Sequence, residues 1–261
     1  MKTFFPAVLK NMKSTCTIQA AKCAMAALSR AVTPLLLGLA LVSPLVTQAA
    51  VTAGPTAVAY LGWLMGLEVV PSKTVNAAGK SIVFAVSGAG TGEGAGDHVK
   101  EALLGYGMMN QVRDFASRVK SGEISFDPQT TLFLLAGGLN DGRRETAIML
   151  PTKIPPFAAV GLRLNPAYEQ FVRQEAAAGF DLWPNHWSAA FDEVMEHPAS
   201  HGIVNTTSAC AGRAIFDQDP TPVGDPATYF FNHDGHPSTA VHRIVGQKLF
   251  EEIAARPPAA Q

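Results

Sequence analysis

The sequence has few cysteines and few charged residues for its length. Three cysteines occur in 261 residues, and two of them, Cys16 and Cys23, lie within the first 50. Cys210 is therefore the single cysteine in the rest of the chain, which excludes an intramolecular disulfide there. We expect it to be a buried, unreactive thiol. Charged residues make up 16% and hydrophobic residues 48% of the chain, a balance typical of a globular domain and not of a disordered protein.

Basic residues are not in excess outside the N-terminal region. The chain carries 20 basic and 21 acidic residues, and residues 1–50 hold five of the basic ones and none of the acidic ones. Residues 51–261 therefore hold 15 basic and 21 acidic residues, a net charge of −6. Nucleic-acid-binding domains present a basic surface, so this moderately acidic body predicts no nucleic-acid partner.

Short motifs of several common ligand sites are also absent. The glycine-rich stretch 87–96, SGAGTGEGAG, contains no G-x-x-x-x-G-K-[ST] phosphate loop. Its glycines match a dinucleotide fingerprint only loosely, and no following strand that ends in an acidic residue supports that interpretation. No H-E-x-x-H zinc motif occurs in the chain. These absences argue against a nucleotide site and against a zinc site of that type.

The longest hydrophobic run lies near the N-terminus and is short. After Arg30, residues 31–50 read AVTPLLLGLALVSPLVTQAA; the run is interrupted by two prolines and is short for a membrane span. It ends in small residues, as signal-peptide cleavage sites do. We therefore expect residues 1–50 to be a signal peptide or leader and the protein to be secreted or periplasmic. The alternatives are an uncleaved anchor and a buried segment.

The rest of the chain alternates between strand-like and helix-like segments. Such alternation predicts an α/β domain with a parallel sheet covered on both faces, over residues 51–255, and a disordered tail at 256–261. The C-terminal helix has Val241, Ile244, Val245, Leu249 and Ile253 on one stripe. The other expected segments are helices at 56–67, 99–120 with an interruption near 105–107, 165–180 and 186–198, strands at 81–86 and 130–138, and a loop from 207 to 229.

Two expected strands are followed by residues suited to a ligand site. The strand at 130–138 leads to Asn140, whose side-chain amide can donate to a developing oxyanion at the carboxyl edge of the sheet. The sequence Asn140-Asp141-Gly142 is equally typical of a simple turn. The strand at 81–86 leads to Gly88, where the absence of a side chain lets the backbone and its N–H approach a ligand closely.

The stretch NHDGHPS, residues 232–238, carries the most polar side chains. Pro237 restricts the backbone after His236, and Ser238 or Thr239 can cap the final helix. His236 on such a loop, with Asp234 nearby to orient its ring, is typical of a general base. The alternatives are a structural role and a metal site formed by His233, Asp234 and His236.

These three blocks, in this order, resemble the SGNH (GDSL) hydrolase family. FAVSGAG matches the family's glycine block at Gly88, GGLND its asparagine block at Asn140, and GHPSTAVHRIVG its histidine block at His236; the resemblance spans residues 54–255. It implies a three-layer α/β/α flavodoxin-like fold with a parallel sheet. It also implies that Gly88 and Asn140 are oxyanion donors and that His236 is the base, with Asp234 orienting it.

The chain departs from the family pattern in two ways. The family places its acid three residues before the histidine, where this chain has His233, and Asp234 lies two residues before. No Gly-Asp-Ser tripeptide occurs in the chain, so the nucleophile block and the first core strand are missing. Ser43 and Ser87 are the candidate substitutes, although Ser87 lacks the G-x-S-x-G context of a nucleophile elbow.

The resemblance implies a hydrolase that acts on carboxylic esters of lipids or small acyl groups. It implies a small-molecule or lipid ester as the partner, with transient contact with lipid surfaces, and no metal or other cofactor. The first alternative is a secreted protein that binds acyl groups or lipids without turnover. The second is a metal-dependent hydrolase that uses His233, Asp234 and His236. Neither the acyl chain nor the oligomeric state follows from the sequence.

Overall fold

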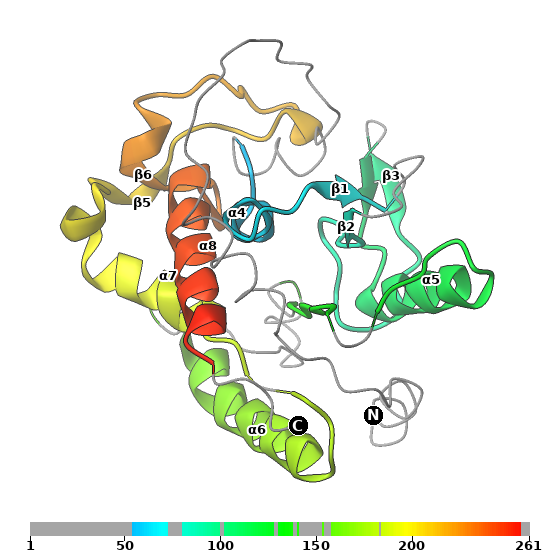
Figure 1. Cartoon of the computed structure of the whole chain (residues 1–261). Coiled ribbons are helices and arrows are strands. Elements are labelled where there is room, and N and C mark those ends of the chain that lie inside the picture. Colours follow the sequence, from blue (N-terminus) through cyan, green and yellow to red (C-terminus); the bar gives the residue numbers. More distant parts are fainter. Residues whose placement is uncertain are drawn as a thin grey trace, which may run out of the picture.

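A computed structural model of the chain shows a mixed α/β fold (Figure 1). The expected leader, Ser43, Asp141 and most of the expected tail lie outside the described residues. No helix in the described part is long and apolar enough to cross a membrane. The structure describes residues 54–72, 80–99, 102–127, 130–137, 140, 153, 158–182 and 184–256.

The strands of the described part form three small sheets. β1 (Val69–Pro71) pairs in parallel with β2 (Ser81–Val83), and β3 (Asp97–Val99) pairs antiparallel with β4 (Ala102–Leu104). β5 (Asn205–Ala209) pairs in parallel with β6 (Tyr229–His233), which also pairs antiparallel with β7 (His236–Pro237). Parallel pairing is thus present, but these strands do not form one continuous sheet.

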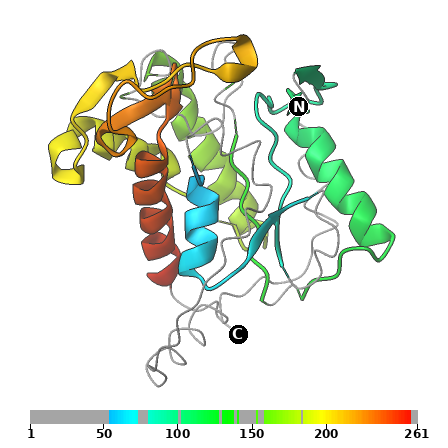
Figure 2. The same ribbon diagram turned by 90° about the horizontal axis from the view of Figure 1, so that it is seen from above.

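Helices lie on two sides of the β1–β2 pair, as Figures 1 and 2 both show. α4 and α8 lie side by side on one side of the pair, and α5 lies on the other. α7 packs against the opposite flank of α8. The helices are α4 (Ala57–Leu64), α5 (Met108–Lys120), α6 (Ala158–Ala177), α7 (Trp187–Glu196) and α8 (Thr239–Ala254).

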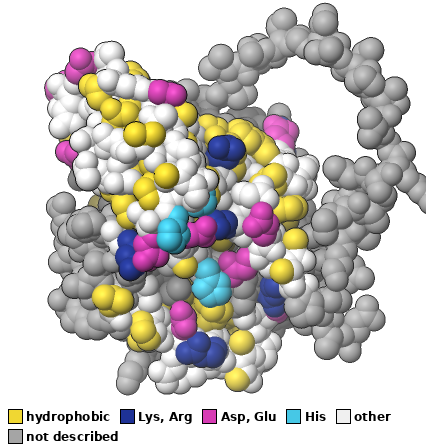
Figure 3. All heavy atoms as spheres, turned by 90° about the vertical axis from the view of Figure 1, so that its left-hand side faces the viewer, with side chains coloured by type: hydrophobic (Ala, Val, Ile, Leu, Met, Phe, Trp, Pro, Cys, Tyr) yellow, Lys and Arg dark blue, Asp and Glu magenta, His cyan; other side chains and the backbone are white. Residues whose placement is uncertain are grey.

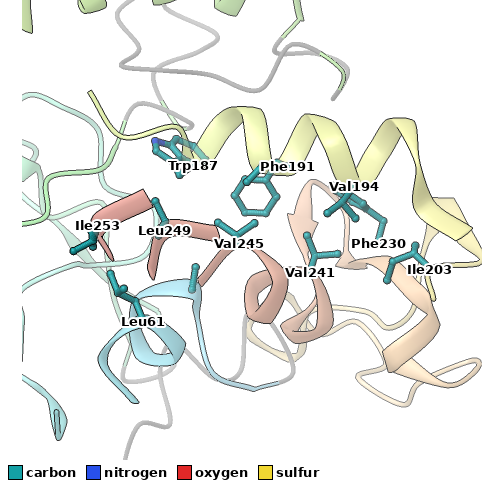
Figure 4. Close-up of a cluster of buried hydrophobic side chains, with 12 residues drawn as sticks. Leu61, Trp187, Phe191, Val194, Ile203, Phe230, Val241, Val245, Leu249 and Ile253 are labelled. Atoms are coloured by element: carbon teal, nitrogen blue, oxygen red, sulfur yellow. The ribbon is translucent and has the colours of Figure 1, made fainter. Parts of the chain in front are cut away.

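The main hydrophobic core lies around α8, between α4, α7 and the start of β6 (Figure 4). The predicted apolar stripe of α8 is confirmed, since every fourth residue from Val241 onward is buried. Cys210 is also buried, with 0% of its surface exposed, as expected. The buried side chains labelled in Figure 4 are Leu61, Trp187, Phe191, Val194, Ile203, Phe230, Val241, Val245, Leu249 and Ile253.

Several predicted segments have different boundaries or structure. Val99 and residues 102–104, expected to be helical, belong instead to β3 and β4, and the helix begins only at Met108. The expected helix cap at Asn165 is wrong, because α6 begins at Ala158 and includes Pro166. The expected loop at 207–229 begins inside β5.

The segment 131–137 is not paired as a strand within the described residues, although a buried strand was expected there. Its side chains still alternate between two environments. Leu132 and Leu134 pack against the main core, whereas the Phe133 ring lies 5.6 Å from the Phe115 ring of α5. Alternating contacts with helices on both sides are what a central strand of an α/β layer makes.

Close contact between α4 and α8 depends on a glycine. Gly246 of α8 is buried, and a Cβ atom there would lie 2.7 Å from both the Ala57 carbonyl oxygen and the Tyr60 Cβ of α4. Contacts this short force the two helices apart. A stability test at this position therefore reports on the packing of α4 against α8.

We predict that Gly246→Ala destabilises the protein. Alanine favours an isolated helix by about 1 kcal/mol over glycine, but overpacking costs about 1–3 kcal/mol, so we expect a net loss in the free energy of unfolding. Urea unfolding followed by circular dichroism measures it. Gln247→Ala, at the exposed neighbouring position, is the control and should stay near wild type. Equal or higher stability of Gly246→Ala would contradict the helix contact.

Candidate functional site

His236 lies on a tight hairpin at the start of α8. β6 ends at His233, Asp234 and Gly235 form the turn, and β7 begins at His236. Gly235 has a φ of +71°, a conformation that residues with side chains rarely adopt. The hairpin and Ser238 therefore hold His236 at a fixed place, as the sequence predicted.

Ser238 anchors the hairpin to the helix. Its hydroxyl donates to the Tyr229 carbonyl at 2.7 Å and accepts from the Val241 N–H at 3.3 Å, which confirms the predicted helix cap. Its own N–H donates to the Phe230 carbonyl at 2.7 Å. With 0% of its surface exposed, Ser238 forms these bonds away from water, where they are strongest.

The His236 ring is oriented by a backbone carbonyl and not by a carboxylate. Its Nδ1 lies 2.8 Å from the Asp234 backbone oxygen. Because a carbonyl only accepts, Nδ1 carries the proton and Nε2 keeps a lone pair. The structure thus corrects the expected role of the Asp234 side chain, which is exposed. Burial lowers the pKa of His236 below its usual value, against a smaller opposite effect of this hydrogen bond.

His233 fills the position where the family has its acid. Its side chain is 2% exposed and its ring lies 4.5 Å from the His236 ring. Burial, together with the nearby His236 and Arg213, lowers the pKa of His233 to about 4. His233 is therefore neutral at pH 7 and supplies no negative charge to His236.

Asn140 lies against the turn that contains Gly88. The Asn140 side-chain amide donates to the Ala89 carbonyl at 3.0 Å. Gly88 lies in a turn closed by the Ala89 N–H and the Val86 carbonyl, with a φ of +75°. Ser87 belongs to the same turn. One N–H of Asn140 and the backbone N–H of Gly88 are thus in one neighbourhood.

Within the described part of the chain, no hydrogen bond or ring contact links this turn to His236. The structure therefore brings the expected site residues into two groups. One group contains Gly88, Asn140 and Ser87. The other contains His236, His233 and the backbone of Asp234.

The glycine-rich loop after β2 does not form an anion cradle at α5. Carbonyl groups of the loop point at the start of this helix: Gly90 accepts from the Met108 N–H at 2.9 Å and Gly92 from the Met109 N–H at 3.2 Å. The Gly107 N–H donates to the Glu93 carbonyl at 2.8 Å. A phosphate site needs these N–H groups free, so the geometry disfavours a nucleotide loop here.

The ligands of the alternative metal site do not assemble. Within the described ranges, no group of three His, Cys, Asp or Glu side chains is placed to hold a metal ion. His233 and His236 contact each other edge to face, and Asp234 points its backbone oxygen, not its carboxylate, at His236.

Charged side chains and histidines also gather on the α7 side of the molecule (Figure 3). There the Glu193 carboxylate pairs with Lys248 and with His201 at 3.4 Å, and His186 Nδ1 lies 2.8 Å from Glu252. A shallow hollow of about 300 Å³ lies among some of these residues. Because their charges are paired with one another at the surface, they suit a stabilising ion-pair cluster more than a ligand site.

Arg213 is the site residue that sequence reasoning missed. Its charge lies close enough to lower the pKa values of both His233 and His236. In the sequence it is 20 residues from His233, inside a segment expected to be a loop. Only the pairing of β5 with β6 brings it there, so no local signal could have identified it.

Known proteins give no independent guide to this site. No protein-family model matches the chain, and no curated protein sequence matches it.

His242 of α8 caps the first turn of α4 across the core. The Ala57 N–H, at the start of α4, donates to His242 Nδ1 at 3.3 Å, whereas Thr56 provides no side-chain cap. Burial lowers the pKa of His242 to about 4. Protonation removes the acceptor, so the cap exists only with the neutral ring.

We predict that acid destabilises the protein through His242 and His233. Both have folded-state pKa values near 4, below the unfolded value of about 6.5. Their contribution is complete above pH 6.5 and is lost as the pH falls toward 4, by at most about 3 kcal/mol each. Thermal unfolding between pH 7 and 4 measures the loss.

The matched variants are His242→Asn and His197→Asn. Asparagine at 242 keeps an acceptor oxygen near the Nδ1 position but does not titrate, so the fall in Tm with acid should be about half as large. His197 is exposed, and its replacement should leave the fall unchanged. An unchanged pH dependence in His242→Asn would refute the cap.

Proposed function

We propose that the chain is a secreted or periplasmic SGNH-type hydrolase domain for carboxylic esters, with His236 as its general base. The observation that carries the proposal is the orientation of the His236 ring. Nδ1 is held by the Asp234 carbonyl, so Nε2 keeps the lone pair that a base needs. A base must also be held in place, and the Ser238 anchor does this.

The placement of the second group supports the same function. An acyl-transfer site needs donors for the oxyanion that forms on the carbonyl oxygen. The Asn140 amide uses one N–H on the Ala89 carbonyl, so its second N–H and the Gly88 N–H are the proposed donors. Helical layers on both sides of the β1–β2 pair and of Phe133 are also consistent with the three-layer α/β/α arrangement proposed for residues 51–255.

The proposed reaction has two steps. His236 removes the proton of a hydroxyl nucleophile, which attacks the ester carbonyl while Gly88 and Asn140 stabilise the oxyanion; His236 then protonates the leaving alcohol. Water releases the acyl group in the same way. Ser87 is the described serine nearest to the oxyanion donors, because it precedes Gly88 in the turn. Ser43 is the other candidate.

A specific observation supports a second function, that of an acyl-binding protein without turnover. The partner of His236 is a neutral carbonyl, and His233 is neutral as well. Neither group stabilises an imidazolium as a carboxylate does. Loss of the carboxylate that orients the histidine of a catalytic triad lowers kcat by about 10⁴. Together with the missing Gly-Asp-Ser block, this favours binding over rapid turnover.

We predict that a fluorophosphonate probe labels one serine and that His236→Ala abolishes the labelling. The probe reacts with a hydroxyl only when a base activates it. Peptide mapping identifies the serine, and His197→Ala is the control that should label normally. The absence of any label on the folded chain would refute the hydrolase and leave the binding protein.

We predict that Asp234→Asn hardly changes the pKa of His236. The backbone oxygen that holds Nδ1 is still present in this variant, and the carboxylate has the smallest effect on the His236 pKa. NMR titration of the ring should give a midpoint below 6.5 in both proteins. Loss of a directly paired carboxylate lowers a histidine pKa by one unit or more. A fall of that size in the His236 pKa of Asp234→Asn would show that the Asp234 carboxylate is the orienting acid.

A further inference from the structure

We infer that Arg213 and His233, beside His236, form a binding site for a single oxyanion group, the phosphate or carboxylate of a small ligand. This site goes beyond the proposed ester hydrolysis. The placement of these side chains and their missing partners support it, and its test does not need turnover.

The pairing of β5 with β6 carries Arg213 to the histidines. The Cys210 N–H donates to the Phe231 carbonyl at 3.0 Å, and the Ala211 N–H donates to the Asn232 carbonyl at 2.7 Å. The segment thus follows β6 up to His233. Because β5 and β6 are parallel, Arg213 and His233 both lie at their carboxyl ends, the edge where α/β folds bind ligands.

A short loop then fixes Arg213. The Arg213 N–H donates to the Gln218 side-chain oxygen at 2.9 Å, and the Gln218 N–H returns to the Arg213 carbonyl at 3.2 Å. The guanidinium carbon lies 4.4 Å from the centre of the Phe216 ring. Stacking on an aromatic face orients the planar guanidinium while leaving its edge for a ligand.

Both Arg213 and His233 have buried nitrogen atoms without a partner. These are Nε of Arg213 and Nδ1 of His233, whose side chain is 2% exposed. A buried polar atom without a hydrogen bond costs free energy, and such atoms mark places that a ligand or ion completes. The two atoms belong to neighbouring side chains, so one group could accept from both.

The missing partner is negatively charged. Burial alone lowers the pKa of Arg213, with no acidic neighbour raising it, and the described ion pairs contain none with Arg213. A partly buried cation beside two histidines repels further positive charge. A planar guanidinium fork matches the oxygens of a carboxylate or phosphate and binds them with two parallel hydrogen bonds.

The test is titration of the purified chain at pH 7 with inorganic phosphate and, separately, with acetate. Ionic strength is held constant with sodium chloride, and the histidine ring resonances are followed by NMR. We expect saturable shifts of His233 and His236 and none of the exposed His197. Saturation by phosphate but not acetate identifies a phosphate site, and the reverse identifies a carboxylate site.

Variants assign the binding to the guanidinium. Arg213→Gln should weaken binding at least about tenfold, the range for charged hydrogen bonds. Arg243→Gln removes an exposed arginine and should bind as wild type does. Arg213→Lys keeps the positive charge but loses the planar guanidinium, so it should bind the anion more weakly than the wild type does. It replaces Arg213→Gln as the test if that variant does not fold.

Two outcomes overturn the inference. One is the absence of a saturable shift of His233 and His236 with either anion. The other is equal affinity in the wild type and in the folded Arg213 variants. Both results concern binding alone, so they are independent of whether the chain labels with fluorophosphonate.

Discussion

The buried hydroxyl of Ser238 is the contact on which the rest of the site depends. It donates to Tyr229 at the start of β6 and accepts from the first turn of α8, so it fixes the helix relative to the strand. His236 lies two residues before it and His242 four residues after it. His236 and His242 are therefore both positioned by one hydrogen-bonded side chain that is fully buried. Removing a partner from such a buried pair costs more than an exposed hydrogen bond contributes.

The site is built around neutral imidazoles in a buried setting. His233, His236 and His242 all have pKa values lowered chiefly by burial, because a charged ring would lose its hydration there. This keeps the Nε2 lone pair of His236 free and His242 available as an acceptor at neutral pH. It also leaves Arg213 as the permanent cation beside them. A charge without a counter-ion in such surroundings is costly, which is why an anionic ligand group is the natural complement.

Much of the local structure could be predicted, and the reasons are local. The stripe of α8 follows from a repeat of apolar residues, and its cap follows from Ser238 just before it. The β3–β4 hairpin was missed because residues 99–104 are apolar enough to continue a helix pattern. The carboxylate of Asp234 was expected to orient the His236 ring, but its backbone carbonyl does so. The sequence shows that Asp234 is near the histidine, but it does not show that a backbone oxygen already accepts from the ring.

The sequence by itself determined the mixed α/β class, the final helix, its cap and the identity of the candidate base. These depend on residues within a few positions of each other, whose propensities and periodicity act over one or two turns. Only the tertiary structure decided that Arg213 lies beside His233, that His242 caps α4, and that Asp234 acts through its carbonyl. Each of these depends on strand pairing, helix packing or ring orientation. Such contacts are selected by the burial of surfaces distant in the chain, which no local pattern encodes.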